Sequence, residues 1–181
     1  SAPYNNEKQE ETMIYEIKDT NKISPLFGHW EETLIWSCLQ GIMGKIYAND
    51  LTAPTAAMAV IGDFTFFAGE PCPELIAYRP PHCTQNFMIA VPQNKLWENM
   101  LTQFYGKKAK IISRYATKKE PPIFNKHHLE KIVASLPKQY TLSMIDSHFY
   151  KLCKSEAWSK DLVSQFSTYE KYRRLGIGVV I

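Results

Sequence analysis

The sequence predicts a mixed α/β fold, in which helices flank a central mixed sheet. Three observations support this fold class. The first half contains a hairpin pattern, apolar residues recur at helical spacing between the strand-like runs, and strands alternate with helices in the second half. The 181 residues are 45% hydrophobic and 13% aromatic, which is enough to bury a core in one domain or in two small ones.

The first half begins with an alternating apolar pattern over residues 13–17, which predicts a short strand. Ser24-Pro25 is typical of a helix start, and an apolar stripe follows it up to the glycines at 41 and 44. The stripe consists of Trp30, Leu34, Ile35, Cys38 and Leu39. Strands are expected over 45–48, 55–61 and 64–68, the last two joined by the hairpin turn Gly62-Asp63. The proline-rich segment 69–86 is expected to be irregular.

The second half predicts a strand over 87–91 and a helix over 92–105 that ends at Gly106. The predicted buried face of that helix is Trp97, Met100, Leu101 and Phe104. A strand over 110–116, a helix over 125–135 capped by Asn125 and a strand over 140–145 follow. Short amphipathic helices are expected over 147–154, 158–166 and 168–174, with Gly176 as a left-handed end.

The two ends of the chain differ in character. Residues 1–12 are polar and are expected to be a flexible tail or tag remnant, with Met13 a plausible native start. Residues 176–181 end in Val179, Val180 and Ile181, which are strand formers. Because an apolar strand needs neighbours, the sequence predicts that this chain is the front part of a longer protein.

Composition excludes several classes of protein. No apolar run approaches the ~20 residues that cross a membrane, and the acidic amino end is no signal peptide. Four distant cysteines favour free thiols, and we expect a cytoplasmic protein. Serine-hydrolase, zinc-protease and phosphate-loop motifs do not occur in the sequence.

Basic residues cluster from Lys107 to Lys119, within a chain of net charge +3. One interpretation is a surface for a phosphate-bearing ligand or nucleic acid, and the other is a solvated strand and turn. We favour the second interpretation, so nucleic acid is not an expected partner.

Asp146 and His148 are the predicted substrate-binding residues. They follow the strand over 140–145, and polar groups at strand ends are where α/β proteins bind ligands. The alternative is that Asp146 caps the next helix and leaves His148 on its surface. His127-His128 is interpreted as the start of a surface helix. No metal site is expected from Cys72, His82 and Cys83, because no fourth ligand lies nearby.

Two longer segments carry a family resemblance. WEETLIWSCLQGIMGKIYANDLTAPTAAMAVIGDFTFFAG and SEAWSKDLVSQFSTYEKYRRLGIGVVI together resemble a bacterial branch of the GCN5-related N-acetyltransferases. Some relatives in that branch are named as zwittermicin-type resistance proteins. The resemblance covers about residues 13–181 and implies acetyl transfer from acetyl-CoA to an amine of a small molecule. It also implies that this chain is the substrate-side region, with the first strand of the cofactor core at 176–181.

The resemblance further implies an Arg/Gln-x-x-Gly-x-Gly/Ala loop that holds the pyrophosphate of acetyl-CoA. Arg173 to Gly178 fits this motif letter for letter. A helix is expected before it and a strand after it, which is the reverse of the order that such a loop needs. We therefore interpret the match as fortuitous, expect the acetyl-CoA core to lie outside this chain, and leave the catalytic residues unassigned.

A second function class is a non-catalytic binding module that is complete as it stands. Its anionic partner would bind the basic segment Lys107–Lys119, with Tyr105 and Tyr115 interleaved. Formation of a homo-oligomer is left open in either case.

Overall fold

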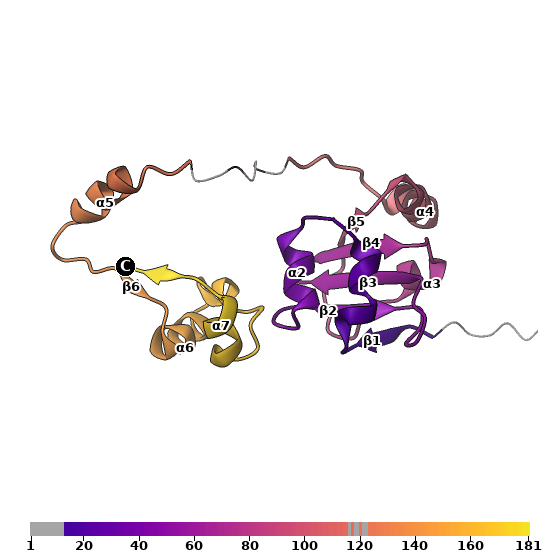
Figure 1. The fold of residues 1–181 in the computed structure, drawn as a ribbon, viewed down its shortest axis with the longest axis horizontal. Helices are drawn as coiled ribbons and strands as arrows, with labels where there is room; N and C mark the ends of the chain where they lie inside the picture. Colours follow the sequence, from indigo (N-terminus) through magenta and orange to yellow (C-terminus); the bar gives the residue numbers. More distant parts are fainter. Residues whose placement is uncertain (1–12, 116, 118–119, 121–122) are drawn as a thin grey trace, which may run out of the picture. The chain divides into compact units, whose positions relative to one another are not determined.

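The computed structural model describes residues 13–115, 117, 120 and 123–181 (Figure 1). The chain divides into two compact units between Ala109 and Lys110. The sequence left open one domain or two small ones, and the structure has two compact units. The predicted tail over 1–12 lies outside the described residues.

The first unit is built on a five-stranded sheet in the order β1-β2-β3-β4-β5. Strands β1 to β4 are antiparallel neighbours, whereas β5 pairs with β4 in parallel. The strands are β1 (Tyr15–Ile17), β2 (Lys45–Ala48), β3 (Ala56–Ile61), β4 (Phe64–Gly69) and β5 (Ile89–Pro92). The predicted mixed sheet is confirmed, and so is the predicted hairpin, in which Ile61 faces Phe64 across the turn.

Helices cover both faces of this sheet. One face packs on α1 (Ser24–Phe27) and α2 (Thr33–Leu39), and the other on α3 (Pro73–Ala77) and α4 (Lys95–Tyr105). The 3-10 turns η1 (Thr20–Lys22) and η2 (Gly106–Lys108) complete the unit. Every residue of β3 is buried, and alternate side chains enter the two cores. The sheet is thus covered on both sides, as the apolar run of β3 requires.

Helix α4 faces the sheet along the line Trp97, Leu101 and Tyr105. The first two are buried, and the Tyr105 hydroxyl donates to the carbonyl of Ile76 at 3.0 Å. The prediction that Phe104 is buried is wrong, since its side chain is 49% exposed. Consecutive helical residues differ by about 100° around the axis, so Phe104 turns away when Tyr105 faces inward.

Three other predictions for this part of the chain need correction. The single helix expected after Ser24 is two helices, because the extended backbone of Glu32 (φ −108°, ψ 119°) separates α1 from α2. The segment 69–86 is not wholly irregular, since Pro73 begins α3. The strand predicted over 110–116 is wrong for 110–115, which have no regular structure, and residue 116 lies outside the described residues.

The second unit contains three helices among its described residues and a short antiparallel pair of strands. Its elements are α5 (Lys126–Ala134), β6 (Ser143–Met144), α6 (Ser147–Ser155), η3 (Lys160–Leu162), α7 (Tyr169–Leu175) and β7 (Val179–Val180). The side chain of Asn125 caps α5, as predicted. The strand predicted near the end of the chain is confirmed as β7, but the helix predicted over 158–166 is only the turn η3.

Gly176 is not the predicted left-handed residue, since its backbone is extended at φ −77° and ψ 139°. Its lack of a side chain has a different reason. A Cβ atom there would lie 2.5 Å from Cδ2 of Tyr172. Glycine therefore allows the chain to pass directly over the Tyr172 ring before β7 begins.

The described residues contain no helix with the length and apolar character that a membrane crossing needs.

Candidate functional site

A recess opens beside the turn of the β3–β4 hairpin, in the first unit. Its walls come from that hairpin and from the loop between α3 and β5. The lining residues are Met58, Gly62, Asp63, Thr65, Phe67, Tyr78, Arg79, Pro80, Cys83, Gln85, Phe87 and Met88. Met58 and Phe67 belong to the buried core beneath it, so the recess is anchored on the sheet.

Arg79 holds the loop that forms one wall of the recess. Its Nη2 atom donates to the carbonyl of Gln85 and, at 3.1 Å, to the carbonyl of Phe87. One guanidinium nitrogen therefore joins two points of the chain, and its charge stays beside the recess. Such charge-assisted bonds are stronger than neutral ones, so they restrict the motion of the loop.

Asp63 places a carboxylate in the same recess. Its backbone carbonyl accepts from the Ile89 amide at 2.7 Å, which ties the hairpin turn to the start of β5. The carboxylate itself has neither a hydrogen bond nor an ion pair within the described part of the chain. The recess is thus lined by one carboxylate, of Asp63, and one guanidinium, of Arg79, which do not form an ion pair with each other.

Cys83 lines the same recess and is half-buried. Burial raises the pKa of its thiol, while Arg79 lowers it and Asp63 raises it. Since the thiolate is the reactive form of cysteine, this thiol is not an activated nucleophile at neutral pH.

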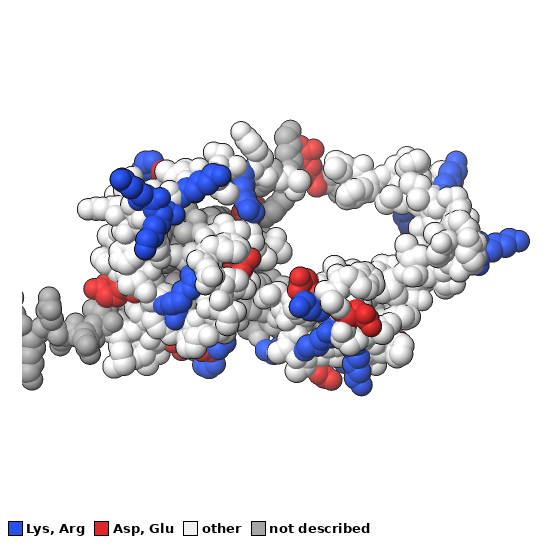
Figure 2. Space-filling view, turned by 180° about the vertical axis from the view of Figure 1, so that it is seen from behind, with Lys and Arg blue, Asp and Glu red and all other residues white. Residues whose placement is uncertain are grey.

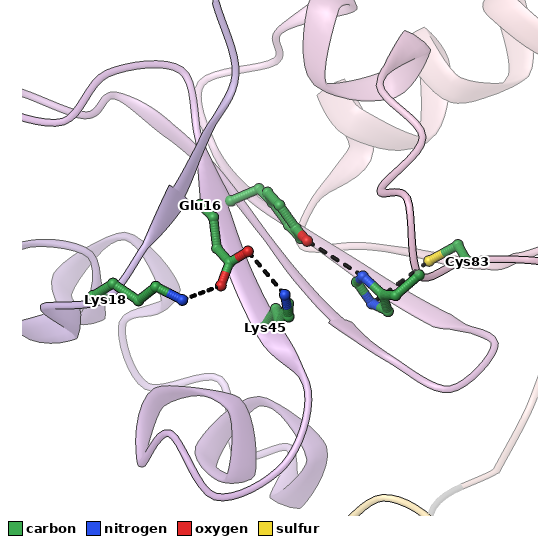
Figure 3. A network of polar contacts seen from close by, with 6 residues as sticks. Glu16, Lys18, Lys45 and Cys83 are labelled. Atoms are coloured by element: carbon green, nitrogen blue, oxygen red, sulfur yellow. Dashed lines mark hydrogen bonds and ion pairs between the residues drawn. The ribbon is translucent and has the colours of Figure 1, made fainter. Parts of the chain in front are cut away.

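Tyr47 and His82 form a polar pair next to Cys83 (Figure 3). The Tyr47 hydroxyl lies 3.3 Å from Nδ1 of His82, and Nε2 of His82 lies 3.8 Å from the Cys83 sulfur. Desolvation lowers the pKa of His82, Lys45 lowers it further and Glu16 opposes both. The imidazole is therefore neutral at pH 7 and can accept a proton.

Glu16 and two lysines extend this network along the sheet edge, as Figure 3 shows. The Glu16 carboxylate contacts Lys18 and, at 2.9 Å, the Lys45 ammonium. Their hydrogen bonds lower the pKa of Glu16. The two lysines partly offset the negative charge of Glu16, which still raises the pKa of His82.

The predicted substrate residues Asp146 and His148 lie in the second unit. Asp146 caps α6, since its Oδ1 accepts from the Phe149 amide at 2.9 Å. His148 is exposed, and its ring contacts that of Phe149 at 5.4 Å between centroids. Asp146 is therefore a helix cap, as the alternative interpretation expected. A substrate role for Asp146 and His148 stays a prediction.

The basic segment is split between different kinds of structure. Lys107 and Lys108 are exposed on η2, and Lys110 and Arg114 lie in the irregular stretch after it. Lys118 and Lys119 lie outside the described residues. Figure 2 shows Lys and Arg side chains gathered on the first unit, over the region where Figure 1 places α4.

Cys72 and His82 contact other protein side chains. The Cys72 thiol donates to the Glu74 carboxylate at 3.2 Å, and His82 contacts Tyr47. Among the described residues, no three His, Cys, Asp or Glu side chains are grouped so that they could hold a metal ion. His127 and His128 are exposed in the first turn of α5, as interpreted from the sequence.

The residues from Arg173 to Gly178 do not fit the pyrophosphate of acetyl-CoA. Their first three residues form the end of α7, and β7 follows Gly178, so the predicted order of helix and then strand is confirmed. The Gly176 amide donates to the Tyr172 carbonyl, and the Gly178 carbonyl accepts from Ile145. A pyrophosphate loop needs free amides converging at a helix start, and this segment has none of that arrangement.

Sequence reasoning missed the roles of Asp63, Arg79 and Tyr47 in this site. Asp63 was interpreted only as a turn residue, and Arg79 lay inside a segment expected to be irregular. A signal was available for Tyr47, because alternation along 45–48 places it on the opposite face from Ile46. The sequence contains no signal that joins these three segments.

Comparison with known proteins identifies the family of this chain. The family model for the GNAT acetyltransferases matches residues 24–181, and so includes residues of both units. A GCN5-related N-acetyltransferase-like protein from Streptococcus suis is similar in structure, with a TM-score of 0.71 and 38% sequence identity. The alignment covers 90% of this chain and 64% of that one, so the present chain spans less than two thirds of its length. No curated protein matches this chain.

Proposed function

This chain belongs to the GNAT acetyltransferase family, and from that premise we propose that it takes part in acetyl transfer from acetyl-CoA to an amine of a small molecule. The observation that supports this most is the family match over residues 24–181, because it includes residues of both units. Placement in the branch with the zwittermicin-resistance-type proteins is part of the proposal and rests on the sequence resemblance.

Within that reaction, the proposed role of this chain is to supply the acceptor side. An amine must lose a proton before or during attack on a thioester, and a neutral imidazole is suited to accept it. His82 is neutral at pH 7 and lies beside Cys83, which lines the recess. In the tautomer with the proton on Nδ1, His82 donates to Tyr47, and the lone pair of Nε2 lies beside the Cys83 thiol. The loop that binds acetyl-CoA is not assigned to these residues.

Because we expect the acetyl-CoA core to lie outside this chain, residues 1–181 alone should be inactive. The assay for this proposal therefore uses a protein in which this chain is joined to an acetyl-CoA-binding core, with acetyl-CoA and a panel of primary amines. Release of free coenzyme A thiol and the mass of the acetylated product are measured together. His82→Gln is expected to lower kcat by about 10²-fold and to remove the acid limb of the pH profile. His29→Gln, an exposed histidine of the same unit, is the matched control and leaves both unchanged. His148→Ala tests the predicted substrate role through KM.

Absence of acetylated product with every amine, when the acetyl-CoA-binding core is present, would contradict the catalytic proposal. If the chain then bound single-stranded nucleic acid in a salt-sensitive way, the binding-module alternative would be favoured. Reversal of charge at Lys107 and Lys108 should weaken that binding and reduce its salt dependence. The basic surface seen in Figure 2 is the observation that motivates this second arm.

A further inference from the structure

We propose that the recess beside the β3–β4 turn binds a small zwitterion, namely an α-amino acid with an apolar side chain, between Asp63 and Arg79. The proposal rests on the proposed function in one respect, which is that the bound amine is the acetyl acceptor. Binding itself is a separate claim and is tested separately.

Asp63 supplies the site for the ammonium group. Its carboxylate is half-buried, lines the recess and has no partner of its own within the described part of the chain. An unpaired carboxylate beside apolar walls gains from a hydrogen-bonded cation, because charge-assisted bonds are the strong ones. The position of Asp63 is well defined, since its own carbonyl is bound to the Ile89 amide.

Arg79 supplies the site for the carboxylate group. Only Nη2 of its guanidinium is used by the loop carbonyls of Gln85 and Phe87. The other donors of the planar group have no hydrogen-bond partner within the described part of the chain. Because the two loop bonds already orient the guanidinium, a carboxylate can bind it with little further loss of side-chain freedom.

The two charges together decide between a zwitterion and a simple amine. Asp63 and Arg79 line one recess, yet no ion pair joins them among the described residues. A ligand with only an ammonium group would be attracted by Asp63 and repelled by Arg79. A ligand with only a carboxylate would be attracted by Arg79 and repelled by Asp63. A ligand that carries both groups is attracted at both ends, so its charge complementarity is better.

The apolar lining accounts for the side chain of the ligand. Met58 and Phe67 lie at the core side of the recess, and Tyr78, Phe87 and Met88 complete the apolar surface. Phe87 is 57% exposed, so a ligand that covers it removes apolar area from water. The methionine side chains adapt easily to different shapes. The recess is too small to enclose a side chain, so an aliphatic side chain such as that of leucine would lie over the exposed Phe87 ring.

The test compares three probes that share one carbon skeleton. Leucine carries both charges, 3-methylbutylamine lacks the carboxylate and 4-methylpentanoate lacks the amine. Each is titrated into the full chain, and the dissociation constant is measured from NMR shifts of residues that line the recess. Leucine is expected to bind at least about tenfold more tightly than either single-charge probe, as one charged hydrogen bond predicts.

Asp63→Asn should weaken leucine binding by about tenfold and leave 4-methylpentanoate binding no weaker than before. Glu70→Gln is the matched control, because Glu70 is an exposed acid of the same unit outside the recess. Because Arg79 also holds the loop, its substitution could disturb the fold. Its contribution to leucine binding is therefore measured by comparing leucine with 3-methylbutylamine, which lacks the carboxylate.

Equal affinity for leucine and 3-methylbutylamine would overturn the proposal, as would a leucine affinity unaffected by Asp63→Asn. Failure of the two claims is distinguishable. Leucine that binds in an Asp63-dependent way but is never acetylated supports the site and contradicts its role as the acceptor site. Leucine that is acetylated equally by wild type and Asp63→Asn overturns the site and supports the proposed acetyl transfer.

Discussion

The protonation of His82 depends on groups from three parts of the first unit. Lys45 and Glu16 act from neighbouring strands, and Tyr47 and Cys83 contact the two ring nitrogens. Desolvation is the largest cause of the lowered pKa. The folded state therefore binds fewer protons than the unfolded state between the two pKa values. The contribution of His82 to stability is full above the unfolded pKa of about 6.5 and is lost as pH falls toward the folded pKa.

Replacing Lys45 by methionine should raise the pKa of His82, because a neighbouring positive charge disfavours the imidazolium form. The pKa is measured from the NMR shift of the His82 ring proton as a function of pH. Lys22→Met is the control, since Lys22 is exposed on η1 and does not act on His82. An unchanged or lower pKa in Lys45→Met would show that this network does not control the imidazole.

Gly69 combines a positive φ of 79° with a close contact at the end of β4. A Cβ atom there would lie 2.2 Å from the carbonyl oxygen of Thr55. Gly69→Ala should therefore lower the free energy of unfolding by about 3 kcal/mol, as measured by urea denaturation. Gly41→Ala has a similar φ of 65° with no atom within 4 Å, and should cost only about 1 kcal/mol. Equal losses would mean that the β3–β4 ladder shifts to accommodate the methyl group.

At the scale of elements, α4 is capped at its amino end by Asn94 and fixed to the sheet by Trp97. The Asn94 side chain accepts from the amides of Leu96 and Trp97 and so caps the helix. The Trp97 indole donates to the Gly69 carbonyl at 2.9 Å, and its ring lies 5.1 Å from that of Phe67. These contacts hold the segment that follows β5, whose neighbour β4 carries one side of the recess.

Trp97→Phe should destabilise the first unit by about 3 kcal/mol, because it leaves a cavity and removes the donor to the half-buried Gly69 carbonyl. The free energy of unfolding is measured by circular dichroism during denaturation. Leu96→Ala, at a 65% exposed position of the same helix, should change it by less than about 0.5 kcal/mol. Similar losses of stability for the two substitutions would contradict the conclusion that α4 packs on the sheet through its Trp97 side.

At the scale of the whole molecule, the described residues form two compact units. The irregular stretch 110–115 leads from one to the other and is exposed. Limited trypsin digestion should therefore cut first at Lys110 or Arg114 and release a stable fragment that ends near residue 109. Mass spectrometry of the products identifies the sites. Lys95 is exposed but lies in a hydrogen-bonded helix, so early cleavage there would contradict this account.

Most of the local structure was predictable because its signals lie between neighbours in the chain. The turn Gly62-Asp63, the cap Asn125 and the apolar strand of β3 each depend on a few adjacent residues. Errors occurred where burial depends on a distant partner. Phe104 is exposed because its neighbour Tyr105 faces inward, and the apolar residues at 110–115 do not pair with a strand.

By itself the sequence determined the mixed α/β class, the hairpin and the family to which the chain belongs. Only the tertiary structure decided which residues meet in the recess. Met58, Asp63, Arg79 and Phe87 come from the hairpin and from a proline-rich loop after it. Periodicity and turn chemistry act over a few residues, whereas these contacts require strand register and the Arg79 loop bonds to be formed first. A site assembled from separate segments is therefore a property of packing, and no local pattern in the chain encodes it.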